Sequence, residues 1–575
     1  MDDEMKPALI NRRPFPGFRA LLALLACALW LPISQTVHSQ AQTPAAAPAP
    51  ISNKHELVTP MRDGAKLATD VYLPEGKGPW PVILMRTPYN KAMQGAQSKQ
   101  WTANGYVFAV QDCRGRFKSE GKYFPFMDDH LDGYDTVEWC AQATWSNGKI
   151  GMIGASAMGI TANQASIMAP PHLVAMYVQV APASAYQHAI YTGGIFRKEL
   201  TEQWLMAQNA QDVLALTFQH YKDDGYVNIR EGKLHWEQVQ VPVYNWGGWY
   251  DIFEQGNIDN FAGLQTKGGG LAAGNQKLMM GPWGHGALAE VKYPANAGAD
   301  LMGSMGKPTE PQRWFDYWLK GINNGMMDEP PVRYYVMGDL SDRAAPGNEW
   351  RTAAAWPPPA KITSYFLQPG GTLSEALVGA TKSSDTYQYD PKNPVPTIGG
   401  ALLFGKKGPL DQRPIGERED VLKFVTAPLD APVEITGKIF VELFAESDCP
   451  DTDWMAKLVD VYPDGTERLV LDNALRARFR EGFDHEVFMQ KAEVNKFKID
   501  LWSTSLIFNR GHRIALHISS SNDPRFDPNP NTGRPMRADR ETRVATNTIH
   551  HSKTYPSRIL LPVVKSYEGK KMAAQ

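Results

Sequence analysis

A serine set among small residues is the strongest chemical signal in this chain. The segment from Ile150 to Gly159 reads IGMIGASAMG, and Ser156 lies between a strand-like apolar run and a helix-competent run. A serine in a sharp strand-to-helix turn presents its hydroxyl above the sheet, and its neighbours must be small because the turn crowds them. The segment therefore predicts a nucleophilic serine, although a serine that only caps a helix gives the same letters.

Two further residues complete this chemistry in chain order. In α/β-hydrolases the nucleophile is followed by an Asp or Glu and then by a His, each in a loop after a later strand. The strand-like run 241–245 leads through glycines to Asp251, and the run 277–280 leads to His285. Of the 13 histidines, only His285 follows Asp251 within this half of the chain in a glycine-flanked loop. We predict Ser156 as nucleophile, His285 as base and Asp251 as acid.

The elements that must position these residues alternate between strands and helices from residue 56 to about 325. We expect strands at 67–73, 82–86, 106–112, 150–154, 174–180, 241–245 and 277–280, and helices at 132–143, 160–169 and 313–320. This alternation predicts βαβ units around a mainly parallel sheet. Long amphipathic stretches between 184 and 240, including 196–216, predict an inserted helical cap.

After the turn at 328–331 the pattern changes to strands without intervening helices. Short alternating runs occur at 332–337, 361–367, 433–444, 454–462, 497–508 and 513–519. Such runs, separated by Pro, Gly, Asp and Asn, predict an all-β sandwich or jelly roll. The predicted fold class is therefore α/β: an α/β-hydrolase domain over 54–327 with a helical cap at about 184–240, followed by an all-β jelly-roll domain over 328–565.

The N-terminal segment predicts export. Basic residues precede an apolar run from 20 to 33, and small residues follow it, which is the pattern of a secretory signal. We predict a signal peptide over 1–39 and a linker over 40–53, and hence a periplasmic or extracellular protein without stable membrane insertion after removal of the leader. A membrane-tethering helix is the alternative that the linker also permits.

Composition excludes several classes of protein. The 575 residues are 43% hydrophobic and 21% charged, which suits a folded protein of about two or three domains. The net charge of -2 lacks the basic excess that binds nucleic acid. Beyond the predicted leader, Cys113, Cys140 and Cys449 remain, and their spacing matches no paired zinc site. We predict no metal and no cofactor, with Cys113 and Cys140 either bridged or present as buried thiols.

Several motifs together resemble the CocE/NonD-type serine hydrolases, the group of cocaine esterase, X-Pro dipeptidyl peptidase, glutaryl acylase and α-amino-acid ester hydrolase. The motifs are Arg62-Asp63-Gly64, Arg86-Thr87-Pro88-Tyr89, Gln111-Asp112-Cys113-Arg114-Gly115, the Ser156 segment, Gly248-Trp249-Tyr250-Asp251 and Gly281-Pro282-Trp283-Gly284-His285. The resemblance covers residues 56–564 and implies a hydrolase domain, a helical cap and a C-terminal jelly roll. The family tolerates the three-residue spacing from Ser156 to Gly159, whereas Ala157 stands where many members carry tyrosine.

The resemblance also implies an oxyanion hole. By motif position its donors are the Tyr89 hydroxyl and the backbone N–H of Ala157, and each such donor stabilises the developing oxyanion. A core-packing aromatic in a proline turn is the alternative for Tyr89. Asp112 and Arg114 are interpreted as a structural ion pair or loop brace.

The residues around the predicted triad bear on specificity. Trp246, Trp249 and Trp283 suit an apolar or aromatic acyl group, and Glu254 is the single acid shortly after Asp251. The α-amino-acid ester hydrolases place adjacent acids there to bind an ammonium group, so the resemblance to that subgroup is weaker.

The predicted function is a serine hydrolase that cleaves small-molecule esters or amides of small acyl groups through an acyl-enzyme. An X-Pro dipeptidyl peptidase would share every predicted catalytic residue. A catalytically dead surface- or carbohydrate-binding protein is the alternative of another class. The sequence leaves the natural substrate open, and it leaves open whether the protein is a homo-oligomer.

Overall fold

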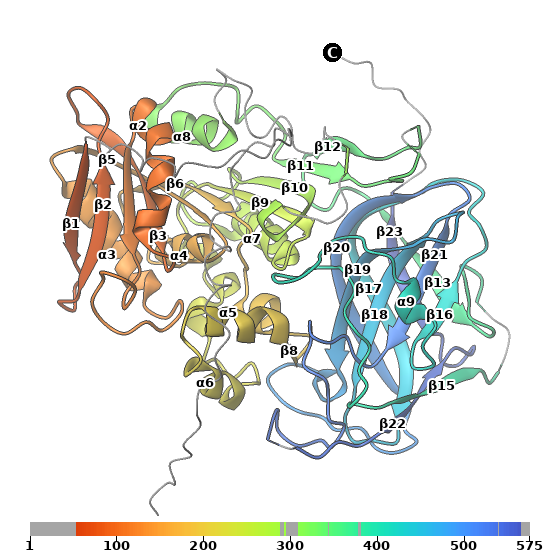
Figure 1. Ribbon diagram of the computed structural model, residues 1–575. Coiled ribbons are helices and arrows are strands. Elements are labelled where there is room, and N and C mark those ends of the chain that lie inside the picture. Colours follow the sequence, from red (N-terminus) through yellow and green to blue (C-terminus); the bar gives the residue numbers. More distant parts are fainter. Residues whose placement is uncertain are drawn as a thin grey trace, which may run out of the picture. The chain divides into compact units, whose positions relative to one another are not determined.

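The computed structural model describes residues 53–287, 293–294, 309–342, 344–377, 381–538 and 540–564. The predicted signal peptide over 1–39 and all but the last residue of the predicted linker lie outside these ranges. Within these ranges, no helix has the length and apolar character that crossing a membrane requires. Figure 1 shows strands and helices mixed in the N-terminal half and mostly strands in the C-terminal half.

A ten-stranded sheet forms the centre of the N-terminal half, with the order β1-β2-β4-β3-β5-β6-β9-β10-β11-β12. The strands are β1 (Lys54–Pro60), β2 (Lys66–Tyr72), β3 (Trp80–Thr87), β4 (Val107–Asp112), β5 (Ser146–Ala155), β6 (Leu173–Gln179), β9 (Val243–Tyr250), β10 (Lys277–Gly284), β11 (Val332–Val336) and β12 (Glu349–Ala353). Neighbours from β4 to β11 pair in parallel. The outer pairs at both edges are antiparallel. The predicted mainly parallel sheet is confirmed.

Helices cover both faces of this sheet. They are α1 (Lys91–Gln94), α2 (Ser98–Ala103), α3 (Asp129–Gln142), α4 (Ala157–Ser166), α7 (Glu254–Lys267) and α8 (Glu310–Lys320). Successive residues of β3 point to opposite faces: Val82 and Leu84 join a core cluster with residues of α3 and α4, whereas Ile83 and Met85 join one with residues of α2 and α8. Burial on both faces explains why β3 reads as a continuous apolar run.

The chain between β6 and β9, where the amphipathic stretch 196–216 was interpreted as part of a helical cap, contains no long helix. It forms short elements: η2 (Tyr186–Ile190), β7 (Tyr191–Thr192), β8 (Ile195–Phe196), η3 (Lys198–Glu202), α5 (Gln203–Ala207), α6 (Val213–Gln219), η4 (Asn228–Arg230), η5 (Gly232–Leu234) and η6 (Trp236–Gln238). Between α5 and α6, Asn209 has a φ of 53°, a left-handed conformation that asparagine tolerates and that ends a helix.

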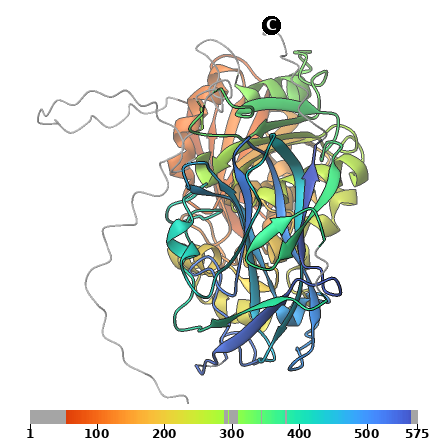
Figure 2. The same cartoon turned by 90° about the vertical axis from the view of Figure 1, so that its right-hand side faces the viewer.

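The C-terminal half contains an eleven-stranded sheet, and the predicted change to β structure is confirmed. Its strands are β13 (Lys361–Gln368), β14 (Thr372–Ser374), β15 (Ser384–Tyr389), β16 (Leu422–Val425), β17 (Val433–Ser447), β18 (Asp453–Val461), β19 (Glu467–Arg476), β20 (Asn495–Phe508), β21 (Arg513–Ser519), β22 (Ala545–His550) and β23 (Arg558–Val563), with the short helices α9 (Arg413–Gly416) and η9 (Ala477–Phe479). Figure 2 shows this half of the protein, coloured from green to blue, from a second side.

The strand predicted at 332–337 belongs to the first sheet. We placed it at the start of the β domain, but β11 pairs in parallel with β10, and β12 extends the same sheet. The backbone of Met337, just after β11, then exchanges hydrogen bonds with Ser505 and Ile507 of β20. The two sheets are therefore joined directly at this point, which the sequence pattern does not reveal.

The three described cysteines are free and buried. Cys113 and Cys140 therefore form no disulfide, and burial raises the pKa of both thiols, which makes them unreactive. This agrees with the alternative of buried thiols.

Arg114 braces its loop, but with partners other than Asp112. Its guanidinium pairs with Asp132 at 2.6 Å and with Asp63 at 2.8 Å. Asp112 instead accepts a hydrogen bond of 2.7 Å from the backbone N–H of Lys91. The predicted Asp112–Arg114 ion pair is therefore wrong, because each side chain satisfies a different loop.

Candidate active site

Ser156 lies in a strained turn between β5 and α4. Its φ of 57° and ψ of -125° lie in a region that residues with a side chain rarely adopt. The turn is held on both sides, because the Ser156 N–H donates to the Gln179 carbonyl at 3.0 Å and the Ser156 carbonyl accepts from the Ile160 N–H at 2.9 Å. The surrounding hydrogen bonds thus maintain a conformation that exposes the hydroxyl at the end of the strand.

The two glycines of the motif are required by close backbone contacts. A Cβ on Gly154 would lie 2.2 Å from the carbonyl oxygen of Met158, which is far inside any allowed contact. A Cβ on Gly159 would lie 3.0 Å from the carbonyl oxygen of Gln179. Met158 itself is buried in the core cluster with α2 and α8. A residue without a side chain is therefore needed two positions before Ser156 and three positions after it. Met158, which directly precedes Gly159, can be large because its side chain packs in the core.

His285 and Asp251 meet Ser156 at one edge of the sheet. Asp251 directly follows β9 and His285 directly follows β10, and these neighbouring strands are parallel, so their carboxyl ends lie together. The Nε2 atom of His285 is 2.9 Å from Ser156 Oγ, and its Nδ1 atom is 2.7 Å from Asp251 Oδ2. Asp251 is fully buried, and its Oδ1 accepts a 2.7 Å hydrogen bond from the Phe253 N–H. This arrangement can move a proton from Ser156 to His285.

Tyr89 and Ala157 lie beside the serine as expected from the motifs. Tyr89 closely follows β3, and its hydroxyl oxygen accepts a hydrogen bond of 2.8 Å from Trp204 Nε1. Burial raises the pKa of Tyr89 to about 12, while hydrogen bonds with Trp204 and Ser156 oppose this shift. The hydroxyl therefore keeps its proton at neutral pH and can donate it. Ala157 begins α4, so its N–H belongs to the first turn, which has no intrahelical acceptor.

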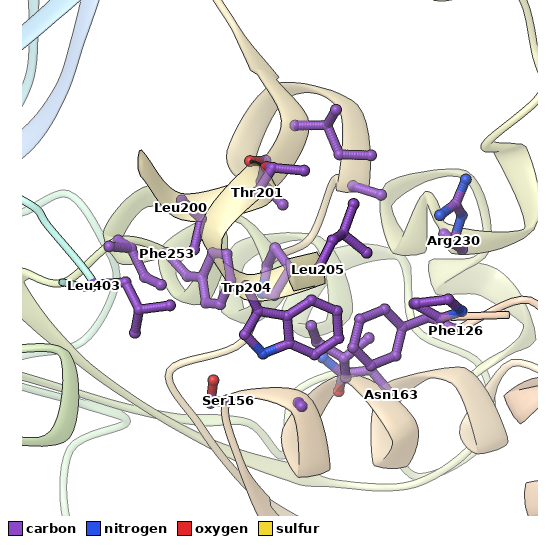
Figure 3. A pocket seen from close by; sticks show the side chains of 18 of the residues that line it. Phe126, Ser156, Asn163, Leu200, Thr201, Trp204, Leu205, Arg230, Phe253 and Leu403 are labelled. Carbon is purple, nitrogen blue, oxygen red and sulfur yellow. Dashed lines mark hydrogen bonds between the residues drawn. The ribbon is translucent and has the colours of Figure 1, made fainter. Parts of the chain in front are cut away.

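A largely apolar cavity opens at Ser156 (Figure 3). Its aromatic lining residues are Phe126, Trp204 and Phe253. The rings of Phe126 and Trp204 are stacked with centroids 5.6 Å apart. The other lining residues are Pro125, Ser156, Ala157, Ile160, Asn163, Gln164, Pro182, Ala185, Ala189, Ile190, Leu200, Thr201, Leu205, Val213, Thr217, Arg230, Gly232, Ile252 and Leu403. Such a surface suits an apolar chain or ring.

The four residues predicted for the substrate pocket do not line this cavity. Trp246 and Trp283 are half-buried, stack on each other with ring centroids 4.8 Å apart, and pack against the core cluster beside α8. Trp249 is buried and donates a 2.7 Å hydrogen bond to the Tyr335 carbonyl. Glu254 is buried at the start of α7, and burial raises its pKa well above its ordinary value. All four are close to the triad in sequence, but Trp249 and Glu254 are buried and Trp246 and Trp283 pack against the core, so none of them lines the cavity.

The residues that do line the cavity come mostly from segments that carry no chemical motif. Phe126 lies in the loop before α3, Trp204 and Leu205 lie in α5, and Leu403 comes from the loop region before β16. The one usable signal was the amphipathic character of the stretch around α5, which we assigned to a helical cap.

The chain matches two families along most of its length. Residues 63–215 and 203–287 match the X-Pro dipeptidyl-peptidase (S15) family, and residues 324–560 match the X-Pro dipeptidyl-peptidase C-terminal non-catalytic domain. Over 580 aligned residues the chain is 33% identical to a cocaine esterase from Rhodococcus sp. (strain MB1 Bresler), covering 88% of this chain and 98% of that relative.

Solved structures show the same relationship. An aminopeptidase from the marine sediment archaeon Thaumarchaeota archaeon is similar with a TM-score of 0.78 and 25% identity, covering 92% of this chain and 99% of that one. An α-amino acid ester hydrolase is similar with a TM-score of 0.77 and 25% identity, covering 91% of this chain and 100% of that one. The chain therefore belongs to the family of serine hydrolases that contains cocaine esterase and the X-Pro dipeptidyl-peptidases.

Proposed function

We propose that this serine hydrolase cleaves esters or amides of small acyl groups through an acyl-enzyme on Ser156. The observation that carries the proposal is the chain of hydrogen bonds from Asp251 through His285 to Ser156, with distances of 2.7 and 2.9 Å, at the mouth of an apolar cavity. Ser156 Oγ attacks the carbonyl carbon while His285 takes its proton, and His285 then gives that proton to the leaving oxygen or nitrogen. Asp251 holds the ring and stabilises the imidazolium. Water releases the acyl group by the reverse sequence.

Two donors then stabilise the oxyanion of the tetrahedral intermediate: the Tyr89 hydroxyl and the Ala157 N–H. A phenolic oxygen has one proton, and its acceptor side is occupied by the indole N–H of Trp204. The Tyr89 proton is therefore not used by Trp204, and it can be donated to a substrate oxygen that binds beside Ser156. Donors that are oriented before the reaction stabilise a developing charge most strongly.

The cavity supports an esterase or acylase better than an X-Pro dipeptidyl peptidase. An exopeptidase of that kind must hold a free N-terminal ammonium group, which favours a carboxylate in its binding site. The described residues that line this cavity include no Asp or Glu. A dead binding protein would have no need for the strained serine turn and its hydrogen-bonded histidine.

The proposal extends to the surrounding architecture and to the location of the protein. Eleven of the 22 lining residues lie between 184 and 240, which supports a role for this segment as the helical cap of the site. We also propose a jelly-roll type for the β domain and export directed by residues 1–39. N-terminal sequencing of the mature protein from periplasm or medium tests the export; a start at residue 1 contradicts it.

The proposed function is tested by labelling and by a substrate panel. A fluorophosphonate probe should label the protein at Ser156, which mass spectrometry of the labelled peptide identifies. The p-nitrophenyl esters of short and aromatic acids should be hydrolysed faster than Xaa-Pro-p-nitroanilides. Faster turnover of the anilides would assign a dipeptidyl peptidase, and absence of both labelling and turnover would leave only a binding protein.

Tyr89→Phe should lower kcat about 10²- to 10³-fold, because it removes one oxyanion donor and keeps the packing of the ring. The measurements are steady-state kinetics on a p-nitrophenyl ester and the melting temperature. Tyr134→Phe is the matched control, since Tyr134 lies on α3 and contacts Arg62, away from the cavity. An unchanged kcat with a lower Tm would show that Tyr89 has only a structural role.

A further inference from the structure

Arg197 connects three parts of the protein with one buried side chain. It directly follows β8 in the segment between β6 and β9, and only 1% of it is exposed. Its Nη1 atom donates to the carbonyl oxygens of His188, in the same segment, and of Ile252, in the loop after β9, both at 2.7 Å. Its guanidinium carbon lies 5.7 Å from the ring centroid of Trp502, in β20 of the β domain. The side chain therefore reaches the loop that carries Asp251.

The hydrogen bond to Ile252 is linked to Asp251 through a single peptide group. The Ile252 carbonyl and the Phe253 N–H belong to the same planar peptide and point in opposite directions. Arg197 donates to the oxygen of this peptide, and its N–H donates to Asp251 Oδ1 at 2.7 Å. A charged donor at the carbonyl polarises the peptide and strengthens its N–H as a donor. Arg197 thus fixes this peptide, which in turn holds the carboxylate with its Oδ2 atom toward His285 Nδ1.

No ion pair explains the position of Arg197. Among the described residues no carboxylate pairs with its guanidinium, and its Nε and Nη2 atoms are buried without an acceptor. The other buried arginines in the described ranges each pair with an aspartate: Arg86, Arg476, Arg478 and Arg525. A buried charge without such a partner costs stability. Features that cost stability in this way are expected at functional sites.

The charge of Arg197 also acts on Asp251. Burial and the nearby Arg525 lower the pKa of Arg197 to about 9, and three carboxylates oppose this shift: Glu199, Asp251 and Asp472. The guanidinium therefore keeps its proton at neutral pH, and it attracts the carboxylate of Asp251.

This charge bears on the protonation of His285. Two other charged groups contact His285 in the described structure: Asp251 at its Nδ1 atom, and Lys407, whose Nζ atom lies 3.4 Å from the His285 carbonyl oxygen. A positive charge near an imidazole disfavours the protonated form of the ring. Loss of the Arg197 charge should therefore favour protonation of His285.

The β domain places Trp502 against Arg197 at an irregular point of its strand. The pairing of β20 with β17 skips Leu501, and Trp502 lies opposite Ile439. Trp502 has a φ of 74°, which a bulky residue rarely adopts. Such a bulge redirects a side chain, and here the indole contacts Arg197 and the ring of His188, whose centroid is 5.8 Å away. Backbone strain of this kind is concentrated at functional sites.

We propose that Arg197 is a positioning residue of the triad, which orients Asp251 through the peptide between Ile252 and Phe253, and that Trp502 holds its guanidinium in place. The inference rests on the proposed function and adds two residues to it. Neither side chain lines the cavity, so neither is expected to touch the substrate. The β domain, although it matches a family of non-catalytic domains, thereby contributes to the reaction.

Two substitutions of Arg197 separate its geometry from its charge. Arg197→Met removes both, so kcat for a p-nitrophenyl ester should fall about 10- to 100-fold, with a smaller change in KM, because Asp251 is less well oriented. The midpoint of the acid limb of kcat/KM should rise by about 0.5 pH unit or more. Arg197→Lys keeps the charge without the planar fork, so its kcat should fall while the midpoint stays at the wild-type value.

Steady-state kinetics from about pH 5 to 9 measure both quantities, and the melting temperature of each variant checks its fold. Arg197→Lys retains a buried cation, so it keeps the proposal testable if Arg197→Met does not fold. Wild-type kcat and wild-type pH profiles in the folded Arg197 variants would overturn the proposal. A purely structural role would lower the melting temperature without moving the acid limb, and that result would overturn it as well.

Trp502→Leu tests the contribution of the β domain, because it removes the aromatic face and keeps an apolar side chain. Its kcat should fall about 3-fold or more, and this effect should be absent in an Arg197→Met background, since both residues act through one contact. Arg558→Met is the matched control: Arg558 also contacts an aromatic ring, that of Phe366 at 5.8 Å, and the variant should keep the wild-type kcat and pH profile. Equal effects of Trp502→Leu in both backgrounds would contradict the role of Trp502.

A titration that needs no turnover separates this inference from the proposed function. NMR of protein with isotope-labelled histidine follows the protonation of His285, whose signal is identified by its loss in His285→Gln. If the protein neither hydrolyses esters nor reacts with the fluorophosphonate, but the His285 midpoint rises in Arg197→Met and not in Arg197→Lys, the proposed function fails and the positioning role stands. If esters are hydrolysed at Ser156, but neither the midpoint nor kcat differs between wild type and Arg197→Met, the positioning role fails and the hydrolase stands.

Discussion

Ser156→Ala should abolish turnover, with kcat reduced by about 10⁶-fold, the range found when the nucleophile of such a triad is removed. The Oγ atom forms the covalent bond to the acyl carbon, and no other described hydroxyl lies within hydrogen-bond distance of His285 Nε2. The assay is single-turnover and steady-state hydrolysis of a p-nitrophenyl ester, together with loss of fluorophosphonate labelling.

The folded state should survive this substitution. The Ser156 Oγ supports no core contact, and the backbone bonds of the turn to Gln179 and Ile160 do not involve the side chain. An unchanged melting temperature and circular dichroism spectrum check this. Ser146→Ala, at the opposite end of the same strand β5, is the matched control and should keep wild-type activity. Retention of more than about a tenth of wild-type kcat in Ser156→Ala would remove this serine from the mechanism.

Asp251→Asn should lower kcat by about 10⁴-fold near neutral pH. The amide oxygen can still accept from the Phe253 N–H, as Asp251 Oδ1 does now, so the loop should keep its geometry. The amide nitrogen, however, would face His285 Nδ1, where the carboxylate oxygen now lies at 2.7 Å. A donor in that place favours the tautomer of His285 that cannot accept the Ser156 proton.

The prediction is checked by kcat and kcat/KM for one ester across pH, with labelling by fluorophosphonate as a second readout. As a control, Asp464→Asn makes the same change from carboxylate to amide in an exposed turn of the β domain. It should leave kcat and kcat/KM unchanged. Wild-type rates for Asp251→Asn would mean that His285 is oriented by another group, and that the acid of the triad was assigned to the wrong loop.

The arrangement of the elements could be predicted where burial leaves a simple pattern. The apolar runs of β3 and β10 are buried on both faces of a parallel sheet, so they stand out from their surroundings. The ends of the elements were less predictable: the run expected over 150–154 extends from 146 to 155 in β5, because its exposed first half carries no apolar signal. The break between α5 and α6 depends on one left-handed Asn209.

The pocket residues could not be predicted because neighbours in sequence are separated by the faces of their elements. Trp246, Trp249 and Trp283 lie within a few positions of the triad, yet Trp249 is buried in the core and the other two pack against it. Trp204 lies 115 positions from Tyr89, yet it donates to that hydroxyl. Several short helices and one loop of the β domain enclose the cavity. Because these segments are far apart in the chain, closeness in sequence to the triad does not predict which residues line it.

The sequence by itself determined the strand-to-helix turn at Ser156 and the order in which Asp251 and His285 follow it. These features are local: small residues around a tight turn and loops directly after apolar strands are legible in a single segment. Only the tertiary structure decided that Trp204 donates to the Tyr89 hydroxyl, that the nearby tryptophans do not line the cavity, and that Arg230 does. These depend on which side chains meet from segments far apart in the chain, and that is set by how the elements pack, which no single segment encodes.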